Sequence, residues 1–137
     1  MGDSEGRYDE GQGELQDLLA VVSWALDRWP DLPLWLGGFS FGGFIAIQAA
    51  EQLQPRHLVT VAPAVSYFHG RRVCLPSTDW LLVQGDADEV VPLAEVQSWL
   101  QLLDRLPTTV VLPGVDHFFH GRLNALKKSI LDKFVIE

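Results

Sequence analysis

A short run of glycine, phenylalanine and serine residues offers the first group that could do chemistry. Residues 38–42 have the sequence Gly-Phe-Ser-Phe-Gly and lie between two apolar stretches. An apolar strand, a sharp Gly-x-Ser-x-Gly turn and a helix form the pattern called a nucleophile elbow, in which a strained turn holds the serine hydroxyl clear of the backbone. We therefore expect Ser40 to be a nucleophile. A Cβ two residues before or after the serine would crowd the strand against the helix, so the turn should require Gly38 and Gly42.

The residue after the serine adds a second expectation. The backbone N–H of Phe41 would lie at the start of the following helix, where it could help to stabilise an oxyanion. The motif alone is nevertheless weak evidence, because glycine-rich turns between a strand and a helix are common in α/β domains. Chemistry at Ser40 therefore needs partners elsewhere in the chain.

Such partners follow two later apolar runs. Asp86 and Asp88 come directly after the run at 80–84, and His117 follows the run at 108–112. Because functional residues collect at the carboxyl ends of parallel strands, these side chains should converge with Ser40. An imidazole can take the proton of a serine hydroxyl, and a buried carboxylate can fix the imidazole tautomer. The order along the chain is serine, aspartate, histidine.

The elements that must position these residues alternate along the chain. Apolar residues at helical spacing predict an amphipathic helix over residues 14–29. After it the sequence predicts strands at 34–38, 57–62, 80–84 and 108–112, and helices at about 42–53, 92–106 and 120–134. The strands are continuous apolar runs, as in sheets whose two faces are both covered. The expected fold is α/β, with a parallel sheet of about four strands flanked by helices.

Composition limits the classes of function. The chain has 137 residues, 47% of them hydrophobic, and a formal net charge of −8. A globular domain is expected, with no nucleic-acid partner and no attraction to an anionic membrane. A single cysteine cannot form an internal disulfide, and the polar, acidic start does not resemble a signal peptide. We expect a cytoplasmic protein without a metal or organic cofactor.

With these residues in this order, the chain resembles the α/β-hydrolase family, whose catalytic residues follow the same order. It is most similar to small bacterial hydrolases without a cap, of the dienelactone-hydrolase and esterase type. Residues 85–92 resemble the acid loop Gly-Asp-x-Asp-x-x-Val-Pro, and residues 114–119 resemble the histidine loop Gly-x-Asp-His-Phe-Phe. The resemblance implies a triad of Ser40 as nucleophile, Asp88 as acid and His117 as base.

Several neighbouring residues have plainer interpretations. Asp86 could brace its turn, as loop aspartates usually do, although it stays a second candidate for the acid. Four phenylalanines, Phe39, Phe41, Phe118 and Phe119, could line an acyl pocket or simply belong to the core. We take Phe39 and Phe119 as the candidate substrate-binding residues.

The sequence also departs from this family. A complete α/β hydrolase has several strands before the elbow strand, whereas this chain has a single helix there. We therefore expect residues 1–137 to form a single partial domain, with a loop at 1–13 and an α/β core at 14–137, that lacks one oxyanion donor. Such a donor is worth about 10²–10³ in rate. The elbow strand would also have an open apolar edge, which favours self-association.

Two functions remain open. The first is a serine hydrolase for a small ester, thioester or lactone. The second is a weak or inactive fragment of such an enzyme that acts as an interaction or assembly module. A phosphate- or nucleotide-binding domain is disfavoured, because no Gly-x-x-x-x-Gly-Lys-Ser/Thr pattern is present.

Overall fold

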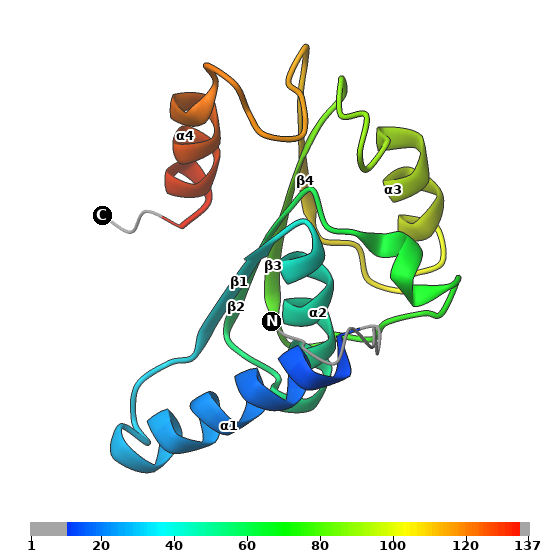
Figure 1. The fold of residues 1–137 in the computed structure, drawn as a ribbon. Helices are drawn as coiled ribbons and strands as arrows, with labels where there is room; N and C mark the ends of the chain where they lie inside the picture. The colour runs from blue at the N-terminus through cyan, green and yellow to red at the C-terminus, as the bar shows by residue number, and fades with distance from the viewer. Residues whose placement is uncertain (1–10, 135–137) are drawn as a thin grey trace. The chain divides into compact units, whose positions relative to one another are not determined.

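The computed structural model describes residues 11–134, which divide into two compact units with the boundary after Leu32. The first unit contains the helix α1 (Gln12–Arg28), drawn in blue in Figure 1. The predicted helix is confirmed, and it begins two residues earlier than expected. At its carboxyl end the Arg28 guanidinium lies 5.1 Å from the ring centroid of Trp24 and 5.6 Å from that of Trp29. Most of the predicted opening loop, residues 1–10, lies outside the described residues.

The second unit is built on a parallel sheet, as the sequence predicts. Its strands are β1 (Trp35–Phe39), β2 (His57–Val61), β3 (Asp79–Gly85) and β4 (Thr108–Leu112), and they pair in the order β1-β2-β3-β4. All three pairings are parallel, with Phe39 beside Val61 and Gly85 beside Leu112. The carboxyl ends of all four strands therefore meet at one edge of the sheet.

Helices cover both faces of this sheet. Figure 1 shows α2 (Phe41–Leu53) and α3 (Leu93–Leu100) on one face and α4 (Leu123–Phe134) on the other. A short 3-10 helix, η1 (Val65–Phe68), follows β2. On the α4 face a buried cluster joins the sheet to the last loop; its members are Val61, Leu81, Val83, Val115 and Phe119.

Two further helix boundaries differ from the prediction, each by three residues or more. The helix expected over 92–106 ends at Leu100, and turns follow it. The last helix begins at Leu123 and not at residue 120. Phe119 and Gly121 have positive φ angles of 56° and 69°, which a right-handed helix does not allow. None of the helices in residues 11–134 is both long enough and apolar enough to cross a membrane.

The turn after β1 depends on one close approach of strand and helix. A Cβ on Gly38 would lie 2.1 Å from the carbonyl oxygen of Gly42, far inside van der Waals contact. A Cβ on Gly42, in contrast, would have no atom within 4 Å. The expectation that both glycines are needed is therefore wrong for Gly42, because its Cβ would point into open space while its backbone fills the space beside Gly38.

These two glycines should respond to alanine by very different amounts. Gly38→Ala should lower the free energy of unfolding by about 3 kcal/mol, because strand and helix must move apart. Gly42→Ala lies in the first turn of a helix and should change that free energy by less than about 1 kcal/mol. Urea unfolding followed by circular dichroism would check this. Equal midpoints for the two variants would contradict it.

Candidate active site

Ser40 stands at the carboxyl end of β1 in a strained backbone conformation. Its φ is 57° and its ψ is −120°, values that a non-glycine residue seldom adopts. The conformation is held by neighbouring backbone groups: the Ser40 N–H donates to the Val61 carbonyl at 2.9 Å, and its carbonyl accepts from the Gly43 and Ala64 N–H groups at 2.9 and 3.0 Å. The sharp turn expected from the sequence is therefore present, fastened to β2, α2 and the loop after β2.

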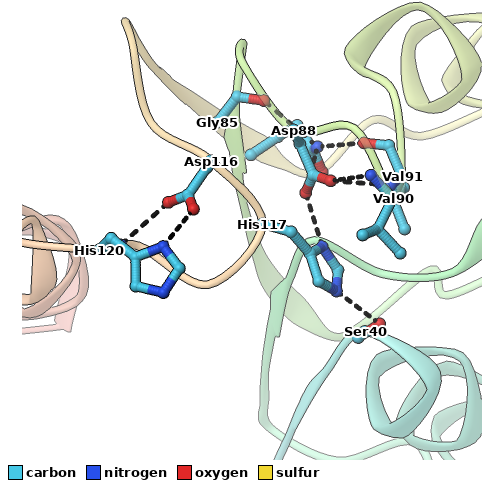
Figure 2. A network of polar contacts seen from close by, with 9 residues as sticks. Ser40, Gly85, Asp88, Val90, Val91, Asp116, His117 and His120 are labelled. Carbon is cyan, nitrogen blue, oxygen red and sulfur yellow. Dashed lines mark hydrogen bonds and ion pairs between the residues drawn. The ribbon is translucent and has the colours of Figure 1, made fainter.

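His117 lies between this serine and a carboxylate. Its Nε2 is 3.0 Å from the Ser40 Oγ, and its Nδ1 is 2.8 Å from the Asp88 Oδ2 (Figure 2). The His117 side chain is 5% exposed and that of Asp88 is fully buried. The structure thus brings together the three residues that the sequence analysis selected. Such a line can pass a proton from the hydroxyl to the imidazole beside a fixed negative charge.

The histidine loop is held against the end of β3. The Ala87 N–H donates to the Val115 carbonyl at 3.0 Å. A Cβ on Gly85 would lie 2.2 Å from that same carbonyl oxygen, so only glycine allows this approach. Asp86 takes part in the same contact, because its Oδ1 accepts the Gly114 N–H at 2.7 Å. Asp86 therefore braces two loops, while Asp88 is the carboxylate that faces His117.

The carboxylate of Asp88 is surrounded by donors. Its Oδ1 accepts the N–H groups of Val90 and Val91 at 2.9 and 2.7 Å. Its Oδ2 receives the side-chain amide of Gln84 at 3.3 Å in addition to His117. Sequence reasoning missed Gln84. The available signal was a polar residue closing an otherwise apolar strand, directly before the acid loop.

A second aspartate–histidine pair lies close by but apart from Ser40. Asp116 Oδ2 is 2.5 Å from His120 Nδ1, and both side chains are exposed (Figure 2). The backbone N–H of His120 donates to Asp116 at 2.9 Å, and this bond is the main cause that lowers the pKa of the Asp116 carboxyl. The pair fixes the turn after His117 and is not part of the line to the serine.

The phenylalanines divide between core and surface. Phe39, 41% exposed, has its ring centroid 4.9 Å from that of His117. Phe119 is only 2% exposed and belongs to the core, although it forms part of the wall of a pocket. This pocket has a volume of about 300 Å³ and is lined by Phe39, Val61, Phe118, Phe119, Leu123 and Leu126. Phe41 packs instead on Phe44 and Tyr67, at 5.7 and 5.1 Å.

Phe118 is the most exposed of these rings. It is 59% exposed and lines both the apolar pocket and a second pocket of about 270 Å³ that contains His117. Phe118 was one of the four phenylalanines considered for an acyl pocket, but only Phe39 and Phe119 were expected to bind substrate. Among residues 11–134, no group of three or more histidine, cysteine or acidic side chains could hold a metal ion.

Comparisons with known proteins agree with this architecture. A family model described as X-Pro dipeptidyl-peptidase (S15 family) matches residues 1–77. The crystal structure of an α/β serine hydrolase without a lid from Xanthomonas campestris is 40% identical, with a TM-score of 0.86 over 97% of this chain and 61% of its own. An α/β serine hydrolase homologue from Coxiella burnetii is 39% identical, with a TM-score of 0.84 over 98% of this chain and 65% of its own.

A curated relative shows the same partial coverage. An uncharacterized protein of Rickettsia prowazekii (strain Madrid E) is 28% identical over 146 residues, which cover 98% of this chain and 61% of the relative. The chain therefore spans 61 to 65% of the length of these three proteins. It is homologous to α/β serine hydrolases, and its four-stranded sheet with flanking helices is part of their fold.

The contact between His117 and Asp88 predicts a particular imidazole tautomer. A carboxylate can only accept, so neutral His117 should carry its proton on Nδ1 and leave Nε2 as an acceptor for Ser40. In Asp88→Asn the new amide can donate to Nδ1 and should move the proton to Nε2. Ring nitrogen chemical shifts would report the tautomer, with Asp86→Asn as the control that should not change it. An Nε2–H tautomer in the unmodified protein would contradict the prediction.

Proposed function

The chain belongs to the X-Pro dipeptidyl-peptidase (S15) family, and we propose that it is a serine hydrolase that cleaves a small ester, thioester or lactone. One observation carries the proposal: the hydrogen-bonded line from the Ser40 hydroxyl through His117 to a buried carboxylate, with contacts of 3.0 and 2.8 Å. A serine hydroxyl is a poor nucleophile until a base takes its proton, and this line supplies the base and orients it.

In the first half of the reaction Ser40 becomes acylated. His117 Nε2 takes the hydroxyl proton as the Ser40 Oγ forms a bond to the substrate carbonyl carbon, and the carbonyl π electrons move to its oxygen. The backbone N–H of Phe41, at the first position of α2, would donate to this oxyanion. When the tetrahedral intermediate collapses, the bond to the leaving group breaks. His117 gives its proton to the departing oxygen or sulfur.

In the second half water replaces the alcohol or thiol. His117 takes a proton from the water molecule, whose oxygen attacks the acyl carbon, and then returns that proton to the Ser40 Oγ as the acid product leaves. Asp88 keeps its negative charge throughout. It holds the imidazole ring in one orientation and stabilises the imidazolium that forms in each half.

The pocket beside the site favours a small apolar acyl group. Its lining is almost wholly hydrocarbon and its volume is about 300 Å³, which is the lower end of the range for small-molecule sites. Phe39 connects this pocket to His117. Short acyl chains would fill it, whereas long chains would extend past Phe118 and Leu123, which are 59% and 65% exposed.

The description of the family model favours a second substrate class, a peptide with proline at its second position. Cleavage of the peptide bond after that proline would use the same acylation of Ser40, with an amine as the leaving group.

A panel of p-nitrophenyl esters from acetate to octanoate, run beside an X-Pro p-nitroanilide, would separate the two substrate classes. We expect the short esters to give the highest kcat/KM and Ser40→Ala to lose that activity. Faster cleavage of the anilide would overturn the ester assignment.

We further propose that the chain associates with a second copy along β1. Within residues 33–134, β1 pairs with β2 alone, and it presents an exposed Trp35 at one end and an exposed Phe39 at the other. Unpaired N–H and C=O groups on an apolar edge strand favour pairing with another chain.

A lysine on the edge strand tests this association. Trp35→Lys should shift the mass measured by light scattering from dimer towards monomer, because a charged residue on an edge opposes pairing. Leu131→Lys is the matched control, since Leu131 on α4 is 47% exposed and Trp35 is 46% exposed. A monomer at all concentrations before mutation would contradict the proposal.

A further inference from the structure

Gln84 is buried beside the candidate site in a way that packing alone does not explain. It is the next-to-last residue of β3 and is fully buried. Its Nε2 donates to the Val91 carbonyl at 2.8 Å, to the Asp88 Oδ2 at 3.3 Å and to the Gly85 carbonyl at 3.4 Å. All three partners are acceptors. The side-chain amide therefore has one possible orientation, because the reverse would place its oxygen against three other oxygens.

The other half of this amide has no partner. The Oε1 of Gln84 is buried and accepts no hydrogen bond from the residues that the structure describes. A buried carbonyl without a donor destabilises the fold, and a methionine of similar volume would avoid that cost. An unsatisfied buried oxygen of this kind is expected where the amide nitrogen of the same side chain has a function.

The function that we infer for Gln84 concerns the Oδ2 of the Asp88 carboxylate. The Asp88 Oδ1 is fixed by two backbone N–H groups that belong to its own loop. The Oδ2, which faces His117, receives one further donor, and that donor comes from the sheet. Because Gln84 also binds the Val91 carbonyl, it ties both the carboxylate and the end of the acid loop to β3. A neutral donor does this without introducing a positive charge that would compete with His117 for the carboxylate.

We propose that Gln84 is a positioning residue for the hydrolytic reaction. Its amide fixes the Oδ2 of Asp88, and through this oxygen it sets the orientation of the His117 ring towards Ser40. This role rests on the proposed function. The contact itself exists whether or not the enzyme turns over, so a measurement on the resting protein can test it separately.

The test compares Gln84→Met with Thr60→Val in the full chain. Thr60 on β2 is also fully buried, and its Oγ1 accepts a hydrogen bond from the Trp80 Nε1 at 2.9 Å, so its loss costs the core a similar bond away from the site. Two quantities are measured: the rate at which a fluorophosphonate labels Ser40, and the downfield proton resonance of the His117 Nδ1–H. We expect Gln84→Met to slow labelling by roughly 10- to 100-fold, the range for one lost hydrogen bond to a charged group, and to shift or broaden the resonance. Thr60→Val should change neither.

The possible results distinguish the role of Gln84 from the proposed hydrolase function. Labelling within about twofold of the unmodified chain and an unchanged resonance in Gln84→Met would overturn the role of Gln84. Slower labelling with an unchanged resonance would also overturn it, because general loss of packing would then be responsible. If Gln84→Met does not fold, Gln84→Asn gives the same test, since its shorter side chain cannot reach Asp88. If the unmodified chain is not labelled at Ser40, the proposed function fails, and the resonance alone decides the role of Gln84.

Discussion

The fold and the site both depend on a fully buried carboxylate. A charge removed from water is tolerated only when hydrogen-bond donors replace the water. Asp88 receives two backbone N–H groups of its own loop, the amide of Gln84 and the imidazole of His117. These donors come from β3, from the acid loop and from the loop after β4. All three segments must therefore keep fixed positions for the carboxylate to remain hydrogen-bonded. Ser40 is then in reach of the imidazole because β1 ends at the same edge of the sheet.

Close backbone contacts make this convergence possible. Gly38 lets β1 approach the first turn of α2, and Gly85 lets the histidine loop approach the end of β3. The parallel register brings the four strand ends to one edge, and these contacts hold the turn at Ser40 and the histidine loop close to the sheet. The strain at Ser40 is maintained by backbone bonds to β2, α2 and the following loop. The rigidity of the sheet therefore stabilises a turn that would not persist in an isolated peptide.

Much of this arrangement could be predicted from the sequence. The apolar runs identify all four strands, and the parallel-sheet rule then places Ser40, Asp88 and His117 at one edge. Other features depend on tertiary contacts that have no local pattern. The late start of α4 follows from the positive φ angles at Phe119 and Gly121. The open space beside Gly42 depends on how the strand meets the helix. Gln84 looks like an ordinary strand residue until its three acceptors are located.

We propose that Ser40 is activated in this chain, which spans 61 to 65% of the length of its relatives. The most direct test is the intact mass of the protein after exposure to a fluorophosphonate, which reacts with an activated serine whatever the natural substrate. We expect a single adduct on the folded chain that is lost in Ser40→Ala. Folded protein that keeps its original mass would show that the hydrogen-bonded line exists without activating the hydroxyl.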